Sequence, residues 1–179
     1  MDSESSNCLA ISEIAPFIRG IPWFVSSQTI SIFSCLVMRS GGILESAIVL
    51  EIIDSAKELV ENKNIEFIIF GSGGLKEQFV KKVKDYGIDN VKFFPLQPME
   101  RVSYVYGLGN ICIVSCKPGL GGSAMPSKTM SILSAGSAIL ASFDEGELTS
   151  ILEQNDCGVC AKAGDVKGFV EKIKMLAAN

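Results

Sequence analysis

The sequence of 179 residues is 47% hydrophobic and 20% charged, and its 16 basic and 20 acidic side chains leave a formal net charge of -4. This composition is typical of one folded globular domain and excludes a mainly disordered chain. The acidic balance also argues against binding duplex nucleic acid by phosphate neutralisation, which needs clustered Lys and Arg, but it is compatible with a small phosphorylated ligand.

Residues 1–28 show no sustained hydrophobic period and are interrupted by Pro16, Gly20 and Pro22. We interpret them as a linker or the remnant of a preceding domain, followed by one domain over residues 29–179. The polar, acidic start does not resemble a secretory signal, and the longest apolar runs are too short to span a bilayer. We therefore expect a cytoplasmic protein without a transmembrane segment, with the inner face of the membrane as a further location to consider.

From Thr29 onward, short apolar runs alternate with helical stretches, which is typical of βα units on a parallel sheet. The predicted strands are 30–38, 65–70, 91–94, 110–115, 138–142 and 158–161, and the predicted helices are 44–61, 75–86, 99–106, 127–135, 146–155 and 166–177. Such continuously hydrophobic strands require burial of both faces of the sheet. The expected fold is an α/β, three-layer, Rossmann-like sandwich with a parallel sheet of about six strands, and its ligands are expected beyond the carboxyl ends of those strands.

Histidine is absent and the six cysteines do not have the spacing of a structural zinc site, so no metal is expected. Cys112 and Cys116 would be separated by about 13 Å along one strand, too far apart to share an ion. Cys157 and Cys160 form a CxxC pair but lack a second pair. Reduced cysteines packed in the core are the expectation.

Two glycine-rich loops follow predicted strands. Gly71-Ser-Gly-Gly74 opens a helix and would bring backbone N–H groups close to a ligand, although a tight βα turn explains the same glycines. The second loop begins at Lys117 and leads into a helix whose first turn holds Ser127, Lys128 and Thr129. Because a helix N-terminus attracts anions, this segment predicts a phosphate site. The alternative is a surface loop capped by Ser127.

Two known phosphate motifs overlap the second loop. Residues 122–129 nearly fit G-x-x-x-x-G-K-[ST], but Ser127 replaces the glycine and Pro126 removes an N–H group, so a P-loop is not expected. Residues 119–124 fit G-x-G-x-x-[GA], with Asp144 where a ribose-binding acid of a dinucleotide site would fall. This motif follows the fourth strand instead of the first, and Pro126 places the helix start beyond it.

A resemblance to the C-terminal domain of family 4 glycosyltransferases of the GT-B fold covers about Thr29 to Ala177. It is carried, in order, by the segments Phe67–Gly73, Val91–Pro95, Met125–Thr129, Ser134–Gly136, Ile139–Ser142 and Asp144–Glu147. The most specific piece is the P-S-K-T helix start, followed by Ala-Gly and an apolar strand. The sequence is most similar to the branch that builds bacterial surface polysaccharides.

In that family the C-terminal domain binds the nucleotide of the sugar donor, and the resemblance implies roles for the matching residues. Gly71 and Gly73 would line the phosphate side, and the segment from Phe94 through Leu96 to Gln97 would flank the base. The pyrophosphate would be received by Ser127, Lys128 and Thr129. The basic residue after the first strand would be Arg39, and the residue beside the sugar or ribose would be Glu147.

The sequence departs from the family pattern at several of these positions. Two glutamates eight residues apart are frequent in the family, and Ser123 and Ser131 stand in their places here. Each hydroxyl can hydrogen-bond a ribose, but the negative charge is lost. The lysine that commonly follows the first-strand arginine is also missing, so diphosphate binding would rest on Lys128, Arg39 and the helix terminus.

The resemblance implies the donor-binding half of a retaining, metal-independent glycosyltransferase of polysaccharide or glycoconjugate biosynthesis. It favours a UDP-sugar over a GDP-sugar as donor, with no cofactor. The acceptor-binding domain is not in the sequence, so we expect it as a partner domain or subunit and expect this chain to be inactive alone. The alternatives are an NAD(P)-binding oxidoreductase fragment or dinucleotide sensor, and a degenerate domain that only mediates contacts.

Overall fold

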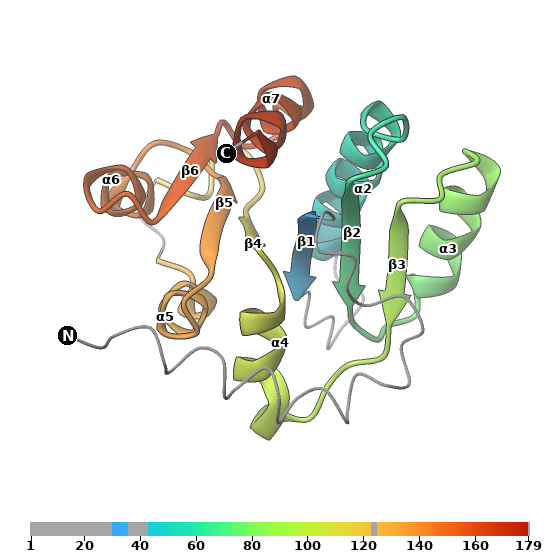
Figure 1. Ribbon diagram of the computed structural model, residues 1–179, viewed down its shortest axis with the longest axis horizontal. Coiled ribbons are helices and arrows are strands. Elements are labelled where there is room, and N and C mark those ends of the chain that lie inside the picture. Colours follow the sequence, from blue (N-terminus) through green and yellow to red (C-terminus); the bar gives the residue numbers. More distant parts are fainter. Residues whose placement is uncertain (1–29, 36–42, 123–124, 179) are drawn as a thin grey trace.

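The computed structural model describes residues 30–35, 43–122 and 125–178, with side chains from Ile48 onward. Six strands form one sheet in the order β3-β2-β1-β4-β5-β6, and every neighbouring pair is parallel (Figure 1). The strands are β1 (Ile30–Cys35), β2 (Ile65–Phe70), β3 (Val91–Phe94), β4 (Ile111–Ser115), β5 (Ala138–Ser142) and β6 (Gly158–Ala161).

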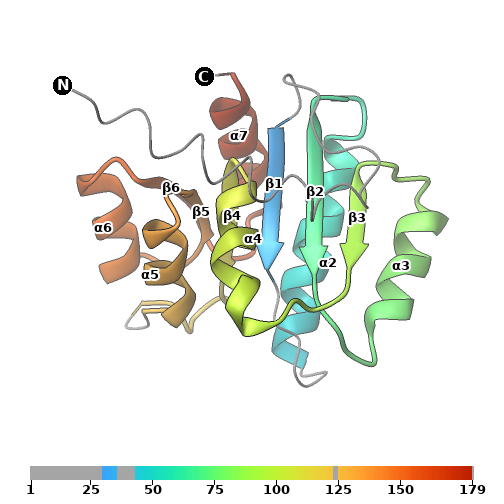
Figure 2. The same cartoon turned by 60° about the horizontal axis from the view of Figure 1, so that its bottom comes forward.

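Helices cover both faces of this sheet, as Figures 1 and 2 show. One face carries α2 (Ile43–Glu58), α3 (Lys76–Asp85) and α7 (Val166–Ala177). The other carries α4 (Val102–Leu108), which follows the short 3-10 helix η1 (Met99–Arg101), then α5 (Ser127–Ser134) and α6 (Glu147–Gln154). Right-handed crossovers explain the division, because the chain adds β2 and β3 on one side of β1 and then β4, β5 and β6 on the other.

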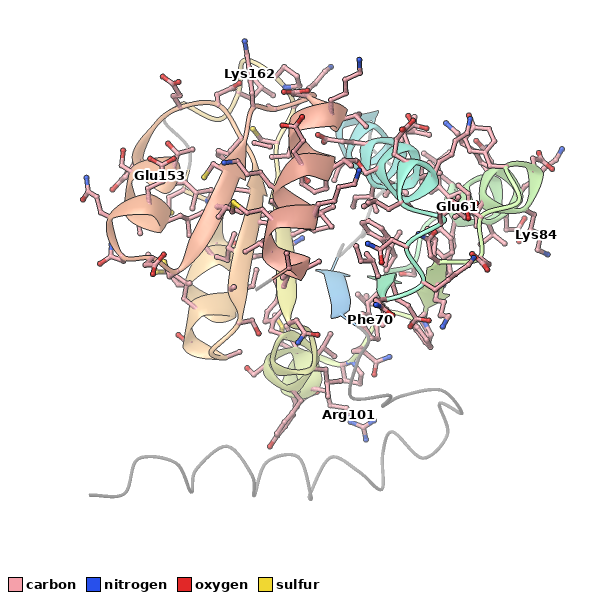
Figure 3. The ribbon with its side chains drawn as sticks, turned by 45° about the horizontal axis from the view of Figure 1, so that its top comes forward. Glu61, Phe70, Lys84, Arg101, Glu153 and Lys162 are labelled. Atoms are coloured by element: carbon pink, nitrogen blue, oxygen red, sulfur yellow. The ribbon has the colours of Figure 1, made fainter. Side chains whose placement is uncertain are left out.

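Each face of the sheet has its own hydrophobic core, because successive side chains of a strand point to opposite faces. Phe67 and Ile69 of β2 pack with α2, α3 and α7, whereas Ile68 and Phe70 pack on the side of α4, α5 and α6. Figure 3 shows Phe70 within the ribbon, while charged side chains project at the periphery, among them those of Lys84, Glu153 and Lys162. Burial on both faces accounts for the continuously apolar strands.

The predicted three-layer, Rossmann-like sandwich with six parallel strands is confirmed. Four strands, β2, β3, β5 and β6, have the predicted bounds. Residues 1–28 and the predicted strand beyond Cys35 lie outside the described residues. Helix α2 ends at Glu58 instead of Glu61, before a turn in which the Asn62 N–H donates to the Leu59 carbonyl at 2.9 Å. No helix in the described part of the chain is long and apolar enough to cross a membrane.

Candidate functional site

The loops that follow the strands share one edge of the sheet. Because all six strands are parallel, residues 71–75, 95–98, 116–122 and 143–146 lie beyond their carboxyl ends, toward which the β1, β2 and β3 arrows point in Figure 2. The strand order reverses between β1 and β4, which is where open α/β sheets leave a crevice for a ligand. The two predicted glycine loops, at 71–74 and from 117, therefore lie at the same edge.

The ends of β2 and β3 are joined by hydrogen bonds. The Gly71 N–H donates to the Phe94 carbonyl at 3.1 Å, and the Phe94 ring stacks on Phe70 with a centroid distance of 5.3 Å. The ammonium of Lys76 donates to the carbonyls of Gly71 and Phe94 at 3.2 and 3.0 Å. The structure thus brings together Gly71 and Phe94, two residues predicted for the site, through a lysine that sequence reasoning missed.

The neighbouring loop residues are more exposed. Gly73 lies at the surface, and its carbonyl accepts the N–H of Lys76 at 3.1 Å as α3 begins. Leu96 is half-buried in the loop after β3. The side chain of Gln97 donates to the Pro95 carbonyl at 3.0 Å, which shapes the segment that the resemblance assigns to the base.

The first turn of α5 lacks a side-chain cap from any described residue. Pro126 is the N-cap residue and has extended backbone angles, so the capping by Ser127 that the alternative interpretation included is wrong: Ser127 is already the first helical residue. Lys128 is half-buried, and the Thr129 side chain is fully buried with a hydroxyl that no described residue hydrogen-bonds. A helix start of this kind presents the positive end of its dipole to an anion.

The glycine loop after β4 is held by Asp144. One oxygen of this carboxylate, Oδ2, accepts the N–H groups of Gly119 at 2.8 Å and Gly121 at 3.0 Å. The loop also packs tightly, since a Cβ at Gly121 would lie 2.7 Å from the Cys116 sulfur. A Cβ at Gly146, in the turn after β5, would lie 2.3 Å from the Gly122 carbonyl oxygen. Both glycines are thus required for loop packing.

This arrangement changes the interpretation of the 119–124 motif. Two of the N–H groups that the sequence offers to a phosphate are already bonded to Asp144. The acid that a dinucleotide fingerprint would direct toward a ribose binds the glycine loop itself. Sequence reasoning placed Asp144 at the right strand end, but could not show that its partner was the preceding loop.

A second carboxylate that sequence reasoning missed is on α2 and reaches the end of β5. Glu51 accepts a hydrogen bond from the Ser142 hydroxyl at 2.6 Å. Burial raises the pKa of Glu51 above its ordinary value, and the hydrogen bonds from Ser142 and from the backbone of Gly164 oppose that rise in part. Its place in the middle of a helix gave no signal for a role at the sheet edge.

Four cysteines whose side chains the structure describes are free thiols: Cys112, Cys116, Cys157 and Cys160. Burial raises the pKa of Cys160 to about 11 and also raises that of Cys116, so neither thiol forms the reactive thiolate readily. Within residues 30–35, 43–122 and 125–178, no three Cys, Asp or Glu residues come together as a metal site.

The remaining predicted residues are dispersed. Ser131 is exposed on α5, and Glu147 is exposed as the first residue of α6. Arg39 and Ser123 lie outside the described residues. The structure therefore places Gly71, Gly73, Phe94, Leu96, the first turn of α5 and Glu147 at or beside the carboxyl edge.

The strand order and the loops at the reversal point define a Rossmann-like domain of the class that binds ligands at the carboxyl edge of a parallel sheet. The chain belongs to the family of glycosyl transferases group 1, whose model matches residues 41–179. This membership agrees with the resemblance found in the sequence. The alternative hypothesis of an oxidoreductase fragment is not supported by the family match.

Two curated relatives carry related names. The putative colanic acid biosynthesis glycosyl transferase WcaI of Escherichia coli is 29% identical over 141 residues, which cover 78% of this chain and 34% of WcaI. The probable glycosyltransferase WbjE of Pseudomonas aeruginosa is 25% identical over 147 residues, which cover 82% of this chain and 34% of WbjE. The chain thus spans about a third of the length of these relatives.

Solved structures share the fold. WaaG, a glycosyltransferase involved in lipopolysaccharide biosynthesis, matches 99% of this chain with 43% of its own, at a TM-score of 0.67 and 15% identity. A Staphylococcus aureus TarM variant in complex with fondaparinux, alpha-GlcNAc-glycerol and UDP matches 85% of this chain with 29% of its own, at a TM-score of 0.64 and 16% identity. The fold is therefore that of one Rossmann-like half of a GT-B enzyme.

Proposed function

We propose that this domain binds the nucleoside diphosphate part of a sugar donor and serves as the donor half of a retaining glycosyltransferase in polysaccharide or glycoconjugate biosynthesis. The observation that carries the proposal is the first turn of α5, which starts at the carboxyl edge without a side-chain cap and contains the half-buried Lys128. The relatives' names and the UDP-bound structure of the same fold support this direction.

The proposed mechanism stabilises the leaving group. When the bond between the sugar and the diphosphate breaks, negative charge develops on the departing phosphate oxygen. Lys128 and the backbone N–H groups at the start of α5 would meet that charge with fixed positive charge and aligned dipoles, which is electrostatic catalysis. Arg39 would add a second cation, and no metal ion takes part in the proposal.

The remaining contacts would hold the nucleotide in place. Gly71 and Gly73 are proposed to line the phosphates, and the loop from Phe94 to Gln97 the base. Hydroxyls of Ser123 and Ser131, with Glu147, would contact the ribose or sugar. The acceptor would be bound by a partner domain or subunit, so we expect binding without detectable transfer or donor hydrolysis by this chain alone.

Calorimetric titration with UDP, GDP and NAD tests the proposal. We expect UDP to bind most tightly. Binding of NAD without UDP would favour a dinucleotide sensor, and no binding of any nucleotide at millimolar concentration would favour a domain that only mediates contacts; either result would overturn the proposal.

Lys128→Ala locates the diphosphate within the site. Loss of a hydrogen bond to a charged group should weaken UDP binding by about 1–3 kcal/mol. UMP should lose much less, because it lacks the second phosphate. The fold should survive, because Lys128 is only half-buried. If UDP binds the folded variant as tightly as the parent protein, the diphosphate does not lie at α5.

A further inference from the structure

Lys76 holds an unusual position at the start of α3. Cations are favoured near the C-terminus of a helix and disfavoured at the N-terminus, where the dipole is positive. Lys76 is nevertheless the first residue of α3, and no described carboxylate forms an ion pair with it. Its placement is therefore explained by its hydrogen bonds and not by the helix it begins.

Those hydrogen bonds join two strand ends. The Lys76 ammonium donates to the carbonyl of Gly71, just after β2, and to that of Phe94, the last residue of β3. The Phe94 carbonyl also accepts the Gly71 N–H, so one oxygen receives donors from two directions. Charged donors make stronger hydrogen bonds than neutral ones, so the ammonium reinforces the pairing where the strands end.

The alkyl chain of Lys76 has apolar surroundings. Lys76 lines a small cavity together with Val49, Ile69, Phe79 and Phe93, which lie between α2, α3 and the sheet. Its side chain is half-buried, so the apolar stem is partly covered and the head group reaches the strand ends. Partial exclusion of water strengthens the bonds between the ammonium and the carbonyls.

We propose that Lys76 is a positioning residue that fixes the base-binding half of the nucleotide site. The inference rests on the proposed function, in which Gly71 and Gly73 line the phosphates and the loop that begins at Phe94 flanks the base. Lys76 ties these two segments to each other. The Phe94 carbonyl already accepts both this ammonium and the Gly71 N–H, so the base would be recognised by groups further along, from Pro95 to Gln97.

The experiment compares Lys76→Met with Lys81→Met, which removes the same charge from an exposed position on the same helix. Affinities for UDP and UMP are measured by calorimetry on variants whose folding is checked by thermal unfolding. Lys76→Met should weaken both nucleotides by the same factor, about tenfold, since the base is common to both. Lys81→Met should leave both affinities unchanged. Lys76→Arg, which can still donate to both carbonyls, should restore binding to within about threefold of the parent.

The ratio between the two nucleotides separates positioning of the base from other roles. A loss confined to UDP would place Lys76 at the diphosphate and overturn the inference, as would unchanged UDP binding by folded Lys76→Met. If Lys76→Met does not fold, Lys76→Gln, whose shorter side chain ends in an uncharged NH2 donor group, replaces it, and UDP and UMP should again be weakened by the same factor. Failure of the parent protein to bind any nucleotide overturns the proposed function itself, and this inference with it.

Discussion

Replacement of Asp144 by alanine should loosen the glycine loop after β4 and destabilise the whole domain. The substitution removes the acceptor of two N–H groups, those of Gly119 and Gly121, at 2.8 and 3.0 Å. A hydrogen bond to a charged group contributes about 1.5–3 kcal/mol, and partial exposure of this loop places both bonds at or below the lower end. We therefore expect a loss of about 2 kcal/mol in the free energy of unfolding, which for a domain of this size lowers the melting temperature by about 4–8 °C.

Two further variants isolate the cause of that loss. Asp144→Asn keeps an acceptor oxygen without the charge and should lose about half as much stability. Glu145→Ala removes an adjacent, exposed carboxylate that lies, like Asp144, just before the N-terminus of α6, and should change the melting temperature by less than about 1 °C. Melting is followed by circular dichroism at fixed pH and ionic strength. Equal melting temperatures for Asp144→Ala and Glu145→Ala would refute the reasoning, since the effect would then be one of local charge only.

Three further predictions concern one buried group, Thr129, and two half-buried groups, Glu51 and Cys160. Thr129→Val should raise the free energy of unfolding by about 1 kcal/mol, because the hydroxyl is buried and no described residue hydrogen-bonds it; a loss of stability in urea unfolding would contradict this. The raised pKa of Glu51 means that the folded state holds this proton more tightly than the unfolded state, so its contribution to stability is complete below the ordinary pKa of 4.5 and is lost as pH rises through the folded pKa. Glu51→Gln should therefore flatten that part of the pH profile of unfolding, and an unchanged slope would refute the assignment. Cys160, with its pKa raised to about 11, should react with iodoacetamide at pH 7.5 far more slowly than free cysteine, as mass spectrometry of the native protein would measure.

The sequence was sufficient to predict the strands and the edge of the sheet at which the loops gather. Runs such as Ile65–Phe70 are apolar throughout because both of their faces are covered, so their bounds are visible without tertiary information. The start of α5 was harder to predict, because serine is a good N-cap residue by type. Only the extended backbone of Pro126 shows that Pro126, and not Ser127, is the N-cap residue.

Contacts between residues far apart in the chain were beyond sequence reasoning. Glu51 and Ser142 are separated by 91 positions, and Lys76 reaches a carbonyl 18 positions away. Neither hydrogen bond can be predicted from hydrophobic periodicity or turn chemistry, because each depends on how the helices pack against the sheet. The polar groups that organise the site are therefore the hardest to predict from a single sequence.

The strand order also divides the sheet into two blocks, each built from a continuous stretch of chain. β1, β2 and β3 form one block and β4, β5 and β6 the other. Where the blocks meet, the described part of β1 pairs with β4 through Ile32 with Ile111 and Phe33 with Cys112, whereas β1 and β2 pair along all six residues. The hydrogen bond from Ser142 to Glu51 is a second link across this seam.

A molecule held by loops from both blocks would act as a clamp across that seam. Separation of the blocks would then require its release, so occupancy would slow unfolding as well as shift the equilibrium. At a ligand concentration 100 times its dissociation constant, the gain in stability is about 2.7 kcal/mol. Resistance of the native protein to proteolysis would rise with occupancy. The rate at which the two blocks separate would therefore report whether the site is occupied.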